Sequence, residues 1–383
     1  MKEKSKTMKL IRRSVIFIVV LVIPSLSAGP AFSQYAEQNT YARHVREGMA
    51  QMKSGDYRAA QDSFESAVRY YDSGIEAHAG LGMVYYNQRE DRSAERELKR
   101  VVELDPRNAG AYEVLGEISY RNDDLETAIS YWETAVTLDP SAPRLRERLE
   151  RVRKEHRTEK DFSRDVTSHF LTKYEGREKI EAGRIILRIL EDAYAEVGRA
   201  LSFYPDREIQ VILYSGEQFR EVTDAPGWSA GIYDGKIRIP VGGIEQETPG
   251  LRRILYHEYT HAVVRTLTPR CPTWLNEGLA QYFEGRGVDP RQWSALRRTA
   301  REGRLPSLSS LEGSFTGLGA DRAAHTYLVS LSAVRYMIDS FGLYRVRYVL
   351  DELASGADAG KALAAGLALS SEEFERGWKK SLE

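Results

Sequence analysis

Residues 251–284 read LRRILYHEYTHAVVRTLTPRCPTWLNEGLAQYFE, and they decide the fold of the second half of this 383-residue chain. Apolar side chains recur at three- and four-residue steps from Leu251 to Val263, a spacing that predicts an amphipathic helix. Pro249-Gly250 stands just before this helix and Thr268-Pro269 closes it. A second helical run, Thr273 to Glu284, follows a short loop, so we expect the two helices to pack against each other.

The first helix carries His257, Glu258 and His261 in the order H-E-x-x-H. Residues four apart lie on one face of a helix, about one turn of ~5.4 Å apart, so both imidazoles can reach one metal ion. A catalytic zinc keeps three protein ligands and a water, and Glu277 on the second helix would be the third ligand. Glu258 is turned slightly away from the pair, where it can take a proton from the activated water. The alternative is a surface helix with two solvated histidines.

HEYTH followed by WLNEGLAQYF resembles the gluzincin metallopeptidases, the thermolysin-like clan, and WLNEGLA is similar to the third-ligand segment of the gluzincin aminopeptidases. The resemblance implies that His257, His261 and Glu277 bind Zn²⁺ and that Glu258 is the general base. The chain has no G-x-M-E-N segment, the amino-terminus-binding signature of those aminopeptidases, so we expect an endopeptidase. Gln281 stands where thermolysin-like enzymes have an Asp that orients a histidine, and we expect another side chain to orient a ligand here.

The resemblance implies two further features beside the metal. Gluzincins hold the substrate backbone on an edge strand, and Lys236–Val241 has the character of one, because Asp234-Gly235 is a hairpin signal and Pro240 cannot donate a ladder hydrogen bond. This assigns substrate binding to the stretch around Ile237–Ile239, with an ordinary surface hairpin as the alternative.

Gluzincins also use a Tyr or His from the C-terminal lobe to donate to the oxyanion of the tetrahedral intermediate. Tyr327 is our candidate and His325 the second, both in the predicted helix His325–Ser340. Two residues apart on a helix, they cannot both face the site. The alternative for Tyr327 is a packing role.

The N-terminal half is repetitive, with a period of 34 residues between 41 and 142. Small residues recur in register, and a large apolar residue follows each pair of them: Gly48, Gly82 and Gly116; Ala60, Ala94 and Ala128; Phe64, Leu98 and Trp132. This pattern resembles the tetratricopeptide repeat, in which paired helices stack into a solenoid. The resemblance implies a protein partner. Residues 34–40 are interpreted as a polar lead-in, and residues 143–160, dense in charge, as a capping and linker helix with a solvated face.

The region 161–383 is expected to form the metallopeptidase domain. We predict one strand within Phe162–Tyr174, a helix at Lys179–Leu201, a buried strand at Glu208–Tyr214 and a strand at Trp228–Tyr233 that pairs with the edge strand. Four helices are predicted around and after the zinc helices, in addition to His325–Ser340: Asp289–Arg304, Tyr344–Leu353, Ala357–Leu367 and Ser370–Leu382.

Residues 1–33 have the pattern of an export signal. A basic start precedes nine apolar residues at Val15–Ile23, and Ala31-Phe32-Ser33 supplies the small residues of a cleavage site. We therefore expect an exported, periplasmic or extracellular protein, with membrane contact only if this segment stays uncleaved. Cys271 is the single cysteine, so no intramolecular disulfide is possible. A net charge of −1 gives no indication of nucleic-acid binding.

These observations predict an α+β chain: an all-α tetratricopeptide-like solenoid, then a thermolysin-like metallopeptidase domain with a small sheet and a helical C-terminal lobe. The expected function is zinc-dependent hydrolysis of a peptide or protein, with the repeats recruiting a partner or substrate. The alternative function is a tetratricopeptide interaction scaffold whose metallopeptidase domain is inactive or regulated.

Overall fold

The computed structural model describes residues 32–176, 179–223, 231–285, 287, 289–315 and 318–383. The predicted export signal therefore lies almost wholly outside the described residues, as does the start of the strand predicted at Trp228–Tyr233. The chain forms two compact units, residues 1–153 and 154–383. The predicted fold class, a helical repeat region followed by a mixed sheet with a helical lobe, is confirmed.

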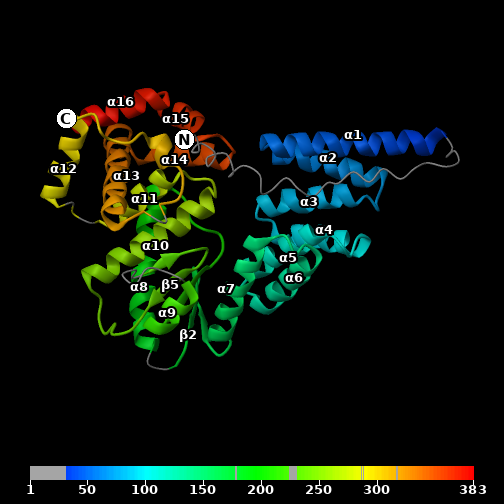
Figure 1. The fold of residues 1–383 in the computed structure, drawn as a ribbon, viewed down its shortest axis with the longest axis horizontal. Helices are drawn as coiled ribbons and strands as arrows, with labels where there is room; N and C mark the ends of the chain where they lie inside the picture. The colour runs from blue at the N-terminus through cyan, green and yellow to red at the C-terminus, as the bar shows by residue number, and fades with distance from the viewer. Residues whose placement is uncertain (1–31, 177–178, 224–230, 286, 288, 316–317) are drawn as a thin grey trace, which may run out of the picture. The chain divides into compact units, whose positions relative to one another are not determined.

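The first unit is built from helix pairs (Figure 1). They are α1 (Phe32–Ser54) with α2 (Tyr57–Tyr70), α3 (Ile75–Asn87) with α4 (Asp91–Leu104), and α5 (Ala109–Arg121) with α6 (Leu125–Leu138). Residues 34–40, interpreted as a polar lead-in, lie in the first turns of α1.

The repeating glycines explain how each pair packs. A methyl group added at Gly48 would lie 2.9 Å from Phe64, at Gly82 it would lie 2.7 Å from Leu98, and at Gly116 it would lie 2.4 Å from Trp132. Each large side chain is buried against the glycine of its own pair. The 34-residue period thus places one small and one large residue where the two helices of each pair cross, which is the packing expected of a solenoid.

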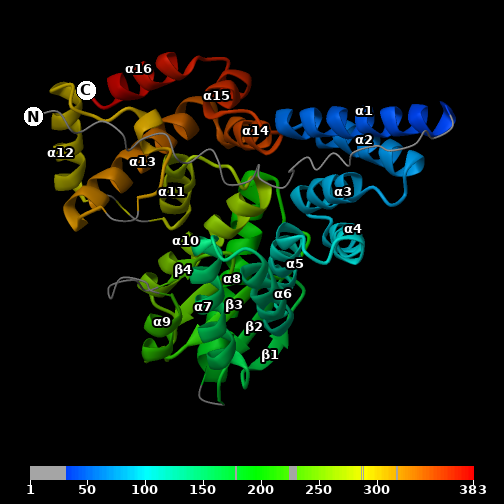
Figure 2. The same cartoon turned by 45° about the vertical axis from the view of Figure 1, so that its right-hand side comes forward.

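The second unit contains a five-stranded sheet in the order β1-β2-β3-β5-β4. Its strands are β1 (Ser163–Val166), β2 (Phe170–Tyr174), β3 (Ile209–Tyr214), β4 (Ile232–Tyr233) and β5 (Ile237–Pro240), several of which are labelled in Figure 2. Strands β2, β3 and β5 are parallel, and β1 and β4 pair antiparallel at the two edges. The single strand predicted within Phe162–Tyr174 is therefore wrong, because that stretch turns back on itself as β1 and β2.

The predicted edge strand is also wrong. Residues 237–240 form β5, which pairs with β3 on one side and with β4 on the other. The edge is β4, where Ile232 pairs with Arg238 and Tyr233 with Ile237. Pro240 is tolerated because it lies at the end of β5, opposite Tyr214 of β3.

The two faces of the sheet are covered differently. Val211 and Leu213 of β3 share a core with α8 (Lys179–Leu201) and α10 (Pro249–Leu267). Ile212 and Tyr214 face the opposite side, where they pack with α9 (Gly216–Thr223). Successive side chains of β3 point to opposite faces of the sheet, so this one strand contributes to two apolar layers.

A buried ionic cluster lies on the second face of the sheet. Lys173, Ile212 and Arg238 are neighbours in register across β2, β3 and β5. The end of α7 (Pro143–Glu159) brings Glu155 and Glu159 onto this row. Glu155 accepts from Lys236 Nζ at 2.8 Å and from Arg238 Nη2 at 3.0 Å. Glu159 pairs with Lys173 and accepts from the Tyr214 hydroxyl, and the five charged side chains are all buried. The expectation of a solvated face for α7 fails in these last turns.

The remaining helices form the C-terminal lobe: α11 (Thr273–Phe283), α12 (Pro290–Arg301), the 3-10 turn η1 (Leu308–Leu311), α13 (Ala320–Phe341), α14 (Leu343–Ala354), α15 (Ala359–Leu367) and α16 (Ser371–Ser381). The predicted helices match them to within a few residues, except that α13 starts before His325. Ser370 and Glu373 form the capping box that begins α16.

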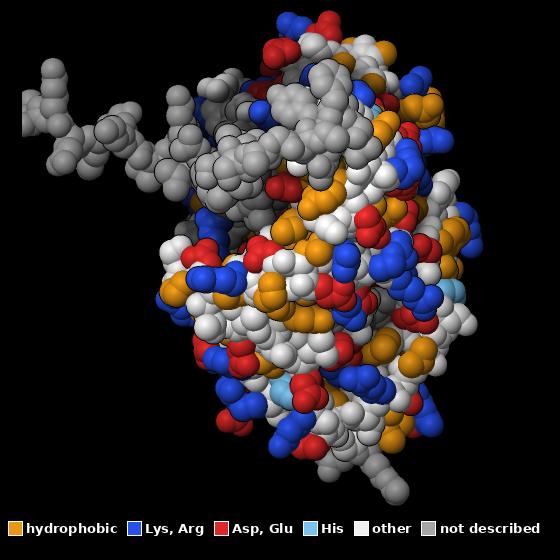
Figure 3. Space-filling model, turned by 90° about the vertical axis from the view of Figure 1, so that its right-hand side faces the viewer, with side chains coloured by type: hydrophobic (Ala, Val, Ile, Leu, Met, Phe, Trp, Pro, Cys, Tyr) orange, Lys and Arg blue, Asp and Glu red, His pale blue; other side chains and the backbone are white. Residues whose placement is uncertain are grey.

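No helix in the described part of the chain is long and apolar enough to cross a bilayer. On the face seen in Figure 3, acidic and basic side chains are mixed rather than gathered by sign.

Candidate metal centre

Helix α10 positions the H-E-x-x-H residues. Thr248 begins the helix, its hydroxyl oxygen accepting from the Leu251 N–H at 3.1 Å, and Pro249 occupies the first turn, where a missing N–H costs nothing. The helix ends at Leu267, and the N–H of the next residue, Thr268, donates to the carbonyl of Val264 at 2.7 Å. Helix α10 is buried along much of its length, so the face with the histidines is held rigidly.

His257 and His261 converge with Glu277 of α11, and the ligand-type atoms of the three residues lie within 4.8 Å of one another. The two Nε2 atoms are 3.1 Å apart, and Glu277 Oε2 lies 3.7 Å from Nε2 of His257 and 3.5 Å from Nε2 of His261. Three atoms with these separations share a point about 2.0 Å from each, which matches the Zn–N distance of ~2.0–2.1 Å. The donor set of two imidazoles and one carboxylate also suits zinc.

Burial and charge support a cation at this point. Glu277 Oε2 is buried and makes no hydrogen bond to any described group, a costly state for a carboxylate unless a cation neutralises it. Burial alone would lower the pKa of His257, but Glu277, Glu284 and Glu258 outweigh it and raise that pKa to about 10. Burial alone would raise the pKa of Glu277, but His261 and His257 lower it to about 2. The surroundings therefore favour a positive charge between these side chains.

Glu258 lies beside the metal group and not in it. It is buried, and burial raises the pKa of its carboxyl above the ordinary value. The backbone N–H of Tyr233 on β4 donates to this carboxylate. Gly231 lets β4 approach, since a methyl group there would lie 2.9 Å from Ile254 and 3.3 Å from the Glu258 side chain. The edge strand next to the site is thus β4, not residues 237–239 as expected.

Glu284, at the end of α11, orients His257. Its Oε2 lies 2.9 Å from His257 Nδ1, so with Nδ1 protonated the Nε2 atom is left to face the metal. Sequence reasoning missed this residue because it followed the family's position, 281. The available signal was the spacing: Glu284 lies seven residues after Glu277, two turns along the same helix face.

Tyr327 and His325 differ in what surrounds them. Burial raises the pKa of Tyr327 to about 12, and the negative charges of Glu277 and Glu258 add to the effect. The backbone carbonyl of Tyr327 accepts from Gln281 of α11, the helix that carries Glu277. Its ring packs edge-on against Phe315 at 5.7 Å. None of the contacts described for the metal group involves His325. The placement therefore favours Tyr327, and its catalytic role stays a prediction.

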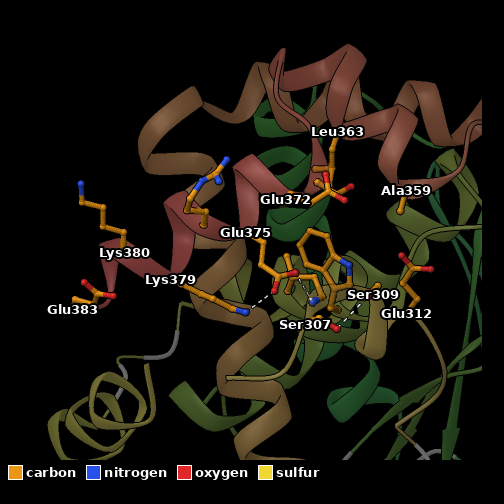
Figure 4. Close-up of a pocket in the computed structure, with 14 residues that line it drawn as sticks. Ser307, Ser309, Glu312, Ala359, Leu363, Glu372, Glu375, Lys379, Lys380 and Glu383 are labelled. Atoms are coloured by element: carbon orange, nitrogen blue, oxygen red, sulfur yellow. Dashed lines mark hydrogen bonds and ion pairs between the residues drawn. The ribbon is translucent and has the colours of Figure 1, made fainter. Parts of the chain in front are cut away.

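Two other features of this unit are separate from the metal group. Burial raises the pKa of the Cys271 thiol, which keeps it protonated and unlike a metal ligand. A pocket of about 710 Å³ opens between η1, α15 and α16, with Trp274 of α11 at its wall (Figure 4). No residue of the metal group lines it, and Glu375 in its lining is already paired with Lys379 and with the Leu308 N–H.

Comparison with known families agrees with both halves of the chain. A family model described as the Peptidase MA superfamily matches residues 192–383. A tetratricopeptide repeat model matches residues 45–91 and 80–143. No curated protein matches the chain.

Proposed function

The chain belongs to the Peptidase MA superfamily, and we propose that it is a zinc-dependent endopeptidase, exported by means of its N-terminal segment. The observation that carries this proposal is the convergence of His257, His261 and Glu277 on one point, with the buried carboxylate of Glu258 beside it. Helices α10 and α11 hold these groups in a packed core, which is the preorganisation that catalysis needs.

The chemistry divides among four side chains. Zinc, when bound, supplies Lewis-acid polarisation of a carbonyl and a lowered pKa for water. Glu258 accepts a proton from the attacking water and returns it to the leaving amine nitrogen, and a carboxyl pKa raised by burial brings this base closer to working pH. The Tyr327 hydroxyl donates to the oxyanion that forms from the scissile carbonyl. Glu284 holds His257 in the required orientation.

Strand β4 is the proposed substrate strand. It lies at the edge of the sheet and touches Glu258 through Tyr233, so a peptide pairing with it in extended form would lie beside the general base. The tetratricopeptide repeats are proposed to bind a protein partner or the substrate itself, because a solenoid of this kind offers an extended binding surface.

Peptide cleavage with and without zinc tests the proposal. The metal-free and the zinc-reconstituted chain are incubated with a peptide library, and the products are identified by mass spectrometry. We expect internal cleavage only in the zinc-reconstituted sample. A zinc-loaded chain that cleaves nothing, while its repeats capture a partner, would support the scaffold alternative.

Export is tested separately by sequencing the N-terminus of the protein from its producing cell. The expected mature terminus lies near Gln34. A terminus before Ile23 would indicate a retained membrane anchor.

A further inference from the structure

Gln281 occupies a position between the third metal-group residue and the oxyanion candidate. Its Nε2 donates to the backbone carbonyl of Tyr327 on α13 at 2.8 Å and to the carbonyl of Glu277 on its own helix at 3.3 Å. One amide group thus joins the backbone at Glu277 to the backbone at Tyr327. A carbonyl has two lone pairs, so each can accept from Gln281 as well as from its own helix.

Close packing at a second point supports the same alignment of α11 and α13. A methyl group added at Gly278 would lie 2.6 Å from the carbonyl oxygen of Ser330 and 2.5 Å from Val334. The backbone of α11 at Gly278 therefore lies directly against the Ser330 backbone and the Val334 side chain of α13, and Gln281 fixes the two helices one turn further along. With both contacts in place, α13 can neither slide nor rotate easily past α11.

We propose that Gln281 is a positioning residue that sets the place of Tyr327 relative to Glu277. This inference rests on the proposed function, because it assigns Gln281 a role in the hydrolytic reaction through Tyr327. Gln281 touches neither the substrate nor the metal. The Gln281 side chain is neutral and donates hydrogen bonds to two backbone carbonyls. Its role therefore differs from that of an acidic residue, which accepts a hydrogen bond from a histidine.

The physical signature of this role is a small effect on stability and a large effect on turnover. A single amide–carbonyl bond contributes little net stability, so its loss should lower the Tm of a unit this size by about 2–4 °C. A shift of about 1 Å in a catalytic group can lower the rate about a hundredfold. A packing role alone would move stability and turnover together.

The test compares Gln281→Met, Tyr327→Phe and the double variant in the zinc-loaded full chain, with Gln292→Met as a matched control. Gln292 is exposed on α12, where the same exchange alters no described contact of the metal group. We expect Gln281→Met to lower kcat about ten- to a hundredfold, with KM within about twofold and zinc content unchanged. The double variant should be no worse than Tyr327→Phe alone, since Gln281 acts through that hydroxyl.

Additive losses in the double variant would overturn the inference, and so would loss of zinc in Gln281→Met, which would mean that Gln281 acts on Glu277. A measurement that does not depend on turnover distinguishes failure of the positioning role from failure of the proposed function. With 3-fluorotyrosine at position 327, added zinc should shift the fluorine resonance in the parent and in Gln292→Met but not in Gln281→Met. If the parent cleaves no peptide, the proposed function fails, and the fluorine experiment still decides the positioning role. An equal shift in all three proteins, or no shift in the parent, would overturn it.

Discussion

Glu155→Gln should destabilise the second unit by about 3–5 kcal/mol, because it removes one partner from a buried ionic cluster. The Glu155 and Arg238 side chains are each only 1% exposed. Glu155 accepts from Lys236 at 2.8 Å and from Arg238 at 3.0 Å. Glutamine has nearly the same shape, but it removes one negative charge from the cluster, the charge that lies within hydrogen-bond distance of both Lys236 and Arg238.

The pKa of Glu155 gives a similar estimate of the stability that the variant would lose. Burial alone would raise the pKa of Glu155, but the charges of Arg238 and Lys236 outweigh burial and lower it from 4.5 to about 2. That difference corresponds to about 3 kcal/mol of stability. Because the folded pKa lies below the ordinary value, this stability is present above about pH 4.5 and is lost as the pH falls towards 2. The gap between parent and variant should therefore narrow on acidification.

The assay is urea-dependent hydrogen exchange of strands β3 and β5, which reports the second unit alone. The matched control is Glu181→Gln, because Glu181 pairs with Arg184 at the surface, where the side chains are 73% and 71% exposed. The control should change stability by less than about 0.5 kcal/mol. If Glu155→Gln costs no more than the control, or if the gap widens in acid, the account of the cluster is refuted.

Three other predictions concern the metal group and the repeats. Glu284→Gln should weaken zinc binding about 10- to 100-fold in a chelator competition, because it loses the carboxylate that orients His257; unchanged affinity would exclude that role. Zinc at a hundred times its Kd should stabilise the second unit by about 2.7 kcal/mol in thermal unfolding, and the double variant His257→Ala/His261→Ala should not respond. Gly116→Ala should destabilise the first unit by about 1–3 kcal/mol in hydrogen exchange of α5 and α6, because the new methyl group overlaps Trp132; Gly242→Ala, with open space around it, should have no measurable effect.

Local sequence patterns were sufficient to predict features that depend on one helix or on two helices adjacent in the sequence. The spacing of His257 and His261, and a Glu on the next helix, predicted a cluster that the fold brings together. The period of 34 predicted both the helix pairs and the small-to-large contacts, such as Gly116 against Trp132. Both features could be predicted because helix geometry fixes which residues share a face.

Pairing between distant segments was not predictable. Lys236–Val241 was correctly interpreted as a strand but wrongly as an edge, because Pro240 cannot donate a ladder hydrogen bond and that suits an edge strand. The stretch that contains Glu155 was interpreted as a solvated helix face because its charges are dense and mixed in sign. Taken separately, the charged residues of α7 and those of the β5 stretch each have the pattern of solvent-exposed residues. They form a buried cluster only because the end of α7 packs over β5. Tertiary packing therefore reversed both assignments.

The measurement that tests the central claim most directly compares parent and Glu258→Gln, both reconstituted with zinc, in turnover of one peptide that the parent cleaves. Both proteins should bind about one zinc per chain and unfold at similar temperatures, because Glu258 lies beside the metal group and not in it. Turnover by the variant should fall by about 10²–10⁴-fold, since only the general base is removed. Near-normal turnover by a zinc-loaded Glu258→Gln variant would contradict the assignment of the base and the mechanism built on it.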